Sequence, residues 1–379
     1  MILSIPPARV HFPEEDRKTI LRQIDEALSS GQLTLGKHVE KFERCFAAKM
    51  GARYAVAVSS GTSALEIPLR IFDVRGKTVL VPTNTFFASA AAVIHAGGRP
   101  RFVDADPASF SVSVRSLEER VTEDTAGVIV VHIAGIVTPE MLAIRDFCKA
   151  CGFFLLEDAA HAQGSQLRGQ FAGTFGDAAS FSFYPTKVIT SAEGGMIVSD
   201  SEKIQREAAI YRDQGKAAFL TNSHTRMGYN WRMSEPHAII GHSQLGRLEE
   251  FIIARSHVAS IYDKHLSDIP GVSPILLPEG CRSNYYKYLA LLDRGIDRST
   301  LKRLLRHEYG VSLSGEVYET PCHQQSVFAS YSHGKFPVAE DICRRHICLP
   351  VYLGMTDEEV HYVLSSLAKA LKTLRGQSV

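Results

Sequence analysis

Apolar residues in the first two thirds of the chain follow two alternating patterns. Short runs rich in β-branched and aliphatic residues are apolar throughout, which is typical of strands that helices bury on both faces. Longer runs between them repeat apolar residues every three or four positions and predict helices. The predicted strands are 54–58, 78–82, 101–104, 127–132 and 153–157, and the predicted helices are 62–72, 87–96, 114–121 and 139–151. This order predicts an α/β protein with a mostly parallel sheet and active residues at strand ends.

The pattern changes after Asp200. A helical stretch ends near residue 213, and a long one covers 234–266 without an internal proline after Pro236. A helix of that length commonly links a large domain to a smaller one. The remaining pattern predicts a strand over 285–292 and helices over 299–308 and 356–374. We therefore predict a large domain over residues 1–250 and a smaller C-terminal α/β domain over residues 251–379.

Composition narrows the class of protein without identifying it. The 379 residues are 45% hydrophobic and 22% charged, as in an ordinary globular protein. The formal net charge of +1 gives no reason to expect nucleic acid or an anionic membrane as a partner, although local clusters can still bind a small anion. No apolar run is long enough to span a bilayer, and the N-terminal residues lack a secretion signal pattern. A cytoplasmic location is the expectation.

The seven cysteines are odd in number and scattered, which argues against a disulfide framework. Cys148 and Cys151 form a Cys-x-x-Cys near the end of a predicted helix, but no second Cys/His pair at zinc spacing follows. We interpret them as two packing thiols and expect no metal site.

Polar residues that follow two of the predicted strands could bind an anion and an aromatic ring. The segment 59–63 opens a helix: Gly61 allows close backbone approach, and Thr62 and Ser63 add hydroxyl donors beside the helix N-terminus. Ser and Thr are also the usual helix caps, so a purely structural role stays open. Phe86 follows the next strand and could stack on a ring, or it could belong to the core.

A lysine and an aspartate supply the most specific signal. Asp158 ends a buried strand, where a carboxylate is costly unless it is paired. It could hold a protonated pyridine nitrogen or cap a helix, and His161 could touch the same ring or lie on the surface. Lys187 follows in a polar turn after Ser182, and an amine there could form a Schiff base. An anion cradle, an aromatic residue, an aspartate and a lysine in this order predict a pyridoxal phosphate (PLP) site.

The chain resembles the nucleotide-sugar aminotransferases of the DegT/DnrJ/StrS family nearly end to end. Those proteins are PLP-dependent enzymes of fold type I, the aspartate aminotransferase fold, with a large domain and a smaller C-terminal α/β domain. The matching motifs are Ser-Gly-Gln-Leu-Thr-Leu-Gly from Ser30, Ser-Gly-Thr-Ser-Ala-Leu from Ser60, Glu-Asp-Ala-Ala-His from Glu157, Ser-Phe-Tyr-Pro-Thr-Lys from Ser182, Gly-Tyr-Asn-Trp-Arg-Met from Gly228, Pro-Cys-His from Pro321 and Leu-Pro from Leu349.

The resemblance implies a role for each candidate residue. Lys187 would hold the cofactor covalently, Asp158 would pair with its ring nitrogen, Phe86 would stack on the ring and His161 would lie close to it. The phosphate would be held by Gly61, Thr62, Ser63 and Ser182.

Four further residues gain roles only from the resemblance. Asn230 matches an asparagine that reaches the phosphate bound in the partner subunit, which implies a homodimer. Arg232 is a candidate for binding a substrate carboxylate, since its planar fork suits that group. His132 and His323 match positions that line the sugar pocket.

The implied activity is transfer of the amino group of L-glutamate to a nucleotide-linked keto sugar, in first place a dTDP-linked 4-keto-6-deoxyhexose. Amination at C3 and a non-catalytic PLP-binding regulatory protein are the alternatives. An α/β nucleotide-binding protein is disfavoured because neither Gly-x-Gly-x-x-Gly nor Gly-Lys-Ser/Thr occurs.

Two departures from the family pattern are visible. Ala192 stands where many relatives carry glycine, and Gln32 replaces an aromatic residue, which puts substrate contacts there in doubt. The lysine is retained, whereas a dehydrating branch of the family carries histidine at that position. Lys187 therefore favours transamination.

Overall fold

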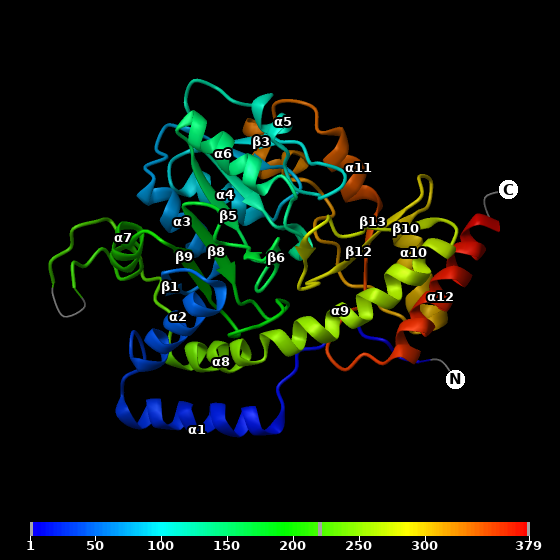
Figure 1. Cartoon of the computed structure of the whole chain (residues 1–379), viewed down its shortest axis with the longest axis horizontal. Helices are drawn as coiled ribbons and strands as arrows, with labels where there is room; N and C mark the ends of the chain where they lie inside the picture. Colours follow the sequence, from blue (N-terminus) through cyan, green and yellow to red (C-terminus); the bar gives the residue numbers. More distant parts are fainter. Residues whose placement is uncertain (1–2, 219–221, 377–379) are drawn as a thin grey trace.

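A seven-stranded sheet forms the centre of the computed structural model, which describes residues 3–218 and 222–376 (Figure 1). The antiparallel strand β9 is the one exception to a parallel arrangement of these seven strands. In sheet order the strands are β1 (Tyr54–Val58), β9 (Gly195–Ser199), β8 (Ala178–Ser182), β5 (Phe154–Asp158), β4 (Thr125–Val131), β2 (Thr78–Pro82) and β3 (Arg99–Val103). The predicted mostly parallel sheet is confirmed.

Helices bury both faces of this sheet, as the uniformly apolar strands predict. Val128 and Val130 of β4 face one apolar cluster, and Ile129 and Val131 face the other. The first cluster includes α2 (Lys37–Met50), α6 (Met141–Cys151) and α8 (Glu235–Gly246). The second includes α3 (Gly61–Ile71), α4 (Phe87–His95) and α7 (Glu202–Arg212). The short helix α5 (Val114–Glu118) ends three residues earlier than predicted.

The long helix predicted over 234–266 is wrong in one respect, because it is two helices. α8 ends at Gly246 and α9 covers Leu248–His265, with Arg247 between them at φ −103° and ψ 1°. The Arg247 guanidinium binds Asp16 of α1 (Glu14–Ser30) and Glu250. This long-range pairing stabilises the break between α8 and α9, at which the sequence has no proline. α9 then runs from the central sheet toward the C-terminal elements (Figure 1).

A second, three-stranded antiparallel sheet lies among the C-terminal elements. It contains β10 (Val272–Pro274), β12 (Tyr288–Leu292) and β13 (His346–Leu349) and shares an apolar cluster with α9, α10 (Arg298–Tyr309) and α12 (Asp357–Gly376). Ile5, near the other end of the chain, packs in the same cluster and bridges to Val311. The division at residue 250 stays a prediction.

Several shorter elements lie outside these two sheets and their helices. They include the three-stranded sheet of β6 (Gln166–Leu167), β7 (Gln170–Phe171) and β11 (Cys281–Arg282), together with helix α11 (Pro337–Arg345). Within residues 3–218 and 222–376, no helix has both the length and the apolar character that crossing a membrane requires.

Candidate active site

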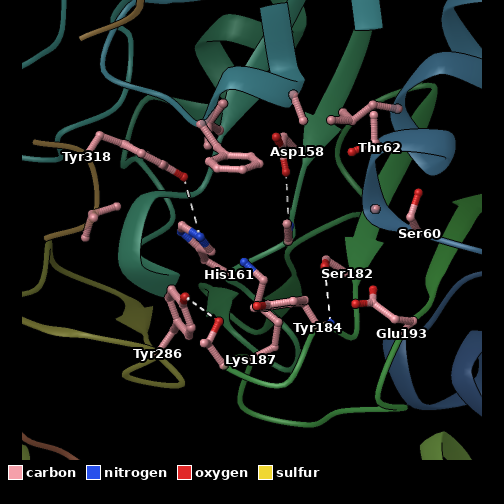
Figure 2. Close-up of a pocket in the computed structure, with 18 residues that line it drawn as sticks. Ser60, Thr62, Asp158, His161, Ser182, Tyr184, Lys187, Glu193, Tyr286 and Tyr318 are labelled. Carbon is pink, nitrogen blue, oxygen red and sulfur yellow. Dashed lines mark hydrogen bonds between the residues drawn. The ribbon is translucent and has the colours of Figure 1, made fainter. Parts of the chain in front are cut away.

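A cavity of about 350 Å³ opens at the carboxyl ends of β5 and β8 and is here called the Lys187 cavity. Parallel strands bring their carboxyl ends to one edge of the sheet, so side chains from distant segments meet there. Figure 2 shows Lys187, Asp158, His161 and Thr62 around this space. The lining residues are Ser60, Gly61, Thr62, Leu65, Phe86, Ala88, Val131, Asp158, Ala160, His161, Ser182, Tyr184, Thr186, Lys187, Glu193, Tyr286, Val317 and Tyr318.

Lys187 lies in the turn after β8, where its backbone N–H donates to the carbonyl of Tyr184 at 2.9 Å. Its Nζ is 4.8 Å from the centre of the Tyr286 ring. Burial lowers the pKa of the amine to about 8, the Asp158 carboxylate opposes that change, and Lys287 adds to it. A substantial fraction of the amine is therefore neutral and nucleophilic near physiological pH.

Asp158 is a buried carboxylate with room for a cationic partner. It accepts hydrogen bonds from Ser89 Oγ at 2.7 Å and from the Ala160 backbone N–H at 3.2 Å. Burial raises its pKa, and these two donors and Lys187 only partly offset the rise. An ionised carboxylate in such a place is stabilised when an opposite charge enters the cavity. A protonated pyridine ring would supply that charge.

The N-terminus of α3 and two glycines form a cradle for an anion. The first N–H groups of a helix lack partners within the helix and attract negative charge. A Cβ on Gly61 would lie 2.8 Å from Ser182 Cβ, and one on Gly195 would lie 2.2 Å from the Ser60 carbonyl oxygen. Both positions therefore require glycine, and Thr62 and Ser182 line the cavity beside them.

Ser63 does not line the cavity. Its N–H donates to Ser60 Oγ at 3.1 Å and its Oγ accepts from the Ser60 N–H at 3.1 Å, which is a reciprocal capping box. Its hydroxyl also donates to the Ser60 carbonyl at 2.8 Å. The Ser63 side chain therefore has the structural role that the sequence left open, which is capping the N-terminus of a helix. Its predicted contact with phosphate gains no support.

Two aromatic groups shape the middle of the cavity. The Phe86 side chain is 59% exposed although it lines the cavity, which leaves a ring face for a flat ligand. His161 stacks on Tyr286 with ring centres 4.2 Å apart. Burial lowers the pKa of His161 well below its usual value, and the two lysines Lys187 and Lys287 act in the same direction, so the imidazole is neutral.

These features fit PLP. An anion cradle at a helix N-terminus, an exposed aromatic face, an unbalanced buried carboxylate and a lysine with a lowered pKa meet in one cavity. Each matches one chemical part of that cofactor: the phosphate, the ring, the ring nitrogen and the aldehyde.

The two predicted pocket histidines lie elsewhere in this chain. His132 is wholly buried, and its Nε2 contacts Glu157 Oε2 at 2.8 Å. His323 is held by Thr83 Oγ1 at 2.7 Å and Glu340 Oε1 at 3.2 Å. Neither histidine lines the Lys187 cavity. Their positions do not support the predicted contact with substrate.

Arg232 and Asn230 also lie outside the cavity of the single chain. The Arg232 guanidinium donates to Asp213 Oδ1 at 2.6 Å. Asn230 is exposed on a segment that bridges to Asp213. An exposed side chain remains accessible to a second subunit, and the role of Asn230 there stays a prediction.

Several functional candidates had no local sequence signal. Tyr286 and Tyr318 line the cavity from segments far beyond Lys187 in the chain. Ser89 holds Asp158, and Gln163 Nε2 donates to the Ser182 carbonyl at 2.7 Å. Only the folded arrangement brings these residues to the lysine and the aspartate.

A sequence model of the DegT/DnrJ/EryC1/StrS aminotransferase family matches residues 14–368. The chain is 32% identical to the GDP-perosamine synthase of Escherichia coli O157:H7, over 91% of this chain and 93% of that protein. It is 31% identical to the UDP-N-acetyl-3-dehydro-alpha-D-glucosamine 3-aminotransferase of Acidithiobacillus ferrooxidans, over 96% of each. It is 32% identical to the dTDP-4-dehydro-2,3,6-trideoxy-D-glucose 4-aminotransferase of Saccharopolyspora spinosa, over 93% of this chain and 94% of that protein.

Two solved structures are similar to this chain over most of its length. The aminotransferase TlmJ of Streptoalloteichus hindustanus has a TM-score of 0.88 at 29% identity and covers 99% of this chain and 100% of its own. NtdA of Bacillus subtilis, solved with bound cofactor PMP, has a TM-score of 0.88 at 26% identity and covers 95% of this chain and 83% of its own. The fold is that of the fold type I PLP-dependent aminotransferases.

Proposed function

The chain belongs to the DegT/DnrJ/EryC1/StrS aminotransferase family, and we propose that it transfers the amino group of L-glutamate to C4 of a dTDP-linked 4-keto-6-deoxyhexose. As a member it is a PLP-dependent nucleotide-sugar aminotransferase. The main support for this catalytic activity is that Lys187 and Asp158 line the same cavity. The similarity to a dTDP-linked 4-aminotransferase supports the choice of sugar.

PLP supplies an aldehyde that condenses with amines and a protonated ring that accepts electrons from the bond being broken. Lys187 would hold the cofactor through its Nζ. The same Nζ, with its lowered pKa, would also serve as the general base that accepts a proton from the α-carbon of the amino donor. In the second half-reaction the same amine moves a proton in the opposite sense.

The other residues hold and tune the cofactor. Asp158 keeps the ring nitrogen protonated through opposite charge. Thr62, Ser182 and the N-terminus of α3 hold the phosphate. Phe86 would stack on the ring, and neutral His161 would lie close to it without adding a competing positive charge.

A shared active site is part of the proposal, with Asn230 reaching the phosphate in the partner subunit of a homodimer. Its exposure outside the cavity of its own chain supports this arrangement. Mixing the inactive variants Lys187→Ala and Asn230→Ala tests it. A mixed dimer contains one site with both wild-type residues, so activity should return on mixing. Two variants that stay inactive after verified subunit exchange would contradict the shared site.

Amination at C3 is the second candidate, because the similarity to a UDP-linked 3-aminotransferase is nearly equal. A panel of 3-keto and 4-keto nucleotide sugars, assayed with glutamate and the purified protein, separates the two. We expect the dTDP-linked 4-keto-6-deoxyhexose to give the highest kcat/KM. A higher value for any 3-keto sugar would refute the choice of C4. Failure of glutamate to convert the bound cofactor would favour a non-catalytic role.

A further inference from the structure

The hydrogen bonds of His161 fix which of its nitrogens carries the proton. The backbone N–H of Ala134 donates to His161 Nδ1 at 3.3 Å, so Nδ1 is an acceptor and carries no hydrogen. The ring is neutral, because burial lowers its pKa well below the usual value. A neutral imidazole has one ring hydrogen, and here it must be on Nε2.

This assignment orients the hydroxyl group of Tyr318. The Tyr318 oxygen lies 3.4 Å from His161 Nε2, and Figure 2 draws that contact. Since Nε2 carries the hydrogen, His161 donates and the phenolic oxygen accepts. The hydroxyl hydrogen of Tyr318 is then free. Among the residues that the structure describes, no other hydrogen-bond acceptor for it is found.

The free hydroxyl belongs to a residue that lines the Lys187 cavity. Tyr318 lies at one side of the cavity, and Thr62 with the anion cradle lies at the opposite side (Figure 2). Burial raises the pKa of the phenol well above its usual value, the Asp158 carboxylate adds to the rise, and a backbone hydrogen bond from Phe86 opposes it. The group therefore remains a protonated donor throughout the working pH range.

We propose that the Tyr318 hydroxyl donates a hydrogen bond to a ligand oxygen at the end of the Lys187 cavity away from Thr62, and that His161 directs it there. The inference rests on the proposed function, since the ligand is the cofactor or the keto sugar. The acceptor is either the phenolic oxygen of PLP or an oxygen of the sugar. Either oxygen would be stabilised by a hydrogen-bond donor at a position partly shielded from solvent.

Tyr318→Phe removes the hydroxyl and keeps the ring, and Tyr331→Phe is the matched control outside the cavity. Equal thermal midpoints establish that each variant is folded. The first measurement is the pH midpoint of the absorbance of the cofactor-loaded protein without sugar. The second is the kcat and KM for the keto sugar at saturating glutamate.

A cofactor acceptor and a sugar acceptor give different results. A donor on the phenolic oxygen weakens the charge that stabilises the protonated lysine adduct, so its loss in Tyr318→Phe raises the midpoint by about one pH unit. A donor on the sugar leaves the midpoint unchanged and lowers kcat/KM roughly tenfold when lost. Tyr331→Phe should change neither quantity.

Values for Tyr318→Phe within twofold of wild type in kcat/KM, together with an unmoved midpoint, overturn the inference. If the wild-type protein aminates no keto sugar, the proposed function fails instead. In that case the midpoint and the rate of the glutamate half-reaction decide the role of Tyr318, and two unchanged values refute it.

Discussion

Glu157 and Asp158 are adjacent at the end of β5, yet they lie on opposite faces of the sheet and differ in how fully their carboxylates are hydrogen-bonded. Glu157 is fully buried on the face of the first apolar cluster. It accepts three backbone N–H bonds from Gly173, Phe175 and Gly176, each at 2.7 Å, and a fourth from His132 at 2.8 Å. Its charge is satisfied within the chain.

Asp158 points to the other face, since successive side chains of a strand alternate. It has two donors and opens onto the Lys187 cavity. The comparison teaches that burial of a carboxylate does not by itself mark a functional site. A carboxylate whose hydrogen bonds are complete stabilises the fold, and one left with spare capacity beside a cavity is available to a ligand.

Among changes at the Lys187 cavity, Lys187→Ala should have the largest effect on activity. Without the amine, neither covalent attachment nor proton transfer is possible, and kcat should fall by a factor of at least about 10⁴. Turnover is measured by release of the 2-oxo acid. The exposed Lys372→Ala in α12 is the matched control and should retain wild-type activity. Residual activity above a hundredth of wild type would break the account of this residue.

Asp158→Asn should lower kcat by roughly 10²- to 10³-fold, because the ring nitrogen would lose its charged and buried partner. The cofactor-free protein should not lose stability. The folded-state pKa of Asp158 is raised by burial, so the folded state binds its proton more tightly than the unfolded state. Stability due to this group therefore falls as pH rises from the usual aspartate range to the raised value.

The asparagine variant should lack that pH dependence and be at least as stable at pH 7. Thermal midpoints of cofactor-free wild type and Asp158→Asn between pH 4 and pH 8 check this. A lower midpoint for the variant at pH 7 would contradict the view that the carboxylate is under-satisfied.

Glu157→Gln should behave in the opposite way to Asp158→Asn: it should lower stability and leave kcat nearly unchanged. An amide accepts through one oxygen and presents an NH₂ group to backbone donors, so the free energy of unfolding should fall by about 3 kcal/mol. Urea denaturation measures the loss. The fraction that remains folded should keep kcat within a few-fold of wild type. A large loss of kcat at full stability would instead make Glu157 part of the active site.

The capture of PLP by the cofactor-free protein should depend on pH through Lys187. The neutral amine is the nucleophile, and its pKa is about 8. The rate should rise roughly tenfold per pH unit below that value and level off above it. Stopped-flow absorbance measures the rate. A profile that still rises steeply at pH 10 would indicate an ordinary, unburied lysine.

Ala192→Gly should have the smallest effect, and it changes the loop between β8 and β9. Ala192 has a φ of 67°, a left-handed conformation that favours glycine. Relief of this strain exceeds the entropy cost of glycine, so we expect a gain of roughly 0.5 kcal/mol. Ala208→Gly inside α7 is the control and should lose about 1 kcal/mol. A loss of stability in Ala192→Gly would contradict the strain.

The sequence predicted the parts of the fold that local pattern decides. Five predicted strands of the central sheet are confirmed within a few residues, because uniformly apolar runs between helices have one stable arrangement. The meeting of Lys187 and Asp158 was predictable for a related reason. Asp158 ends β5 and Lys187 follows β8, and these two parallel strands have their carboxyl ends at the same edge of the sheet.

The features of the fold and the site that the sequence did not predict depend on contacts between distant segments. The break at Arg247 requires Asp16, more than two hundred positions earlier. The placement of His132 away from the cavity requires Glu157 on the neighbouring strand. Tyr286 and Tyr318 reach the cavity from segments without a local motif. A single sequence carries no signal for these pairings.

The central claim is that the Lys187 cavity holds PLP covalently through Lys187. Borohydride reduction of the cofactor-loaded protein, followed by peptide mass spectrometry, tests it most directly. We predict a phosphopyridoxyl adduct on the peptide that contains Lys187 and on no peptide that contains Lys287. A colourless protein that remains unmodified after incubation with PLP, or an adduct on another lysine, would contradict the claim.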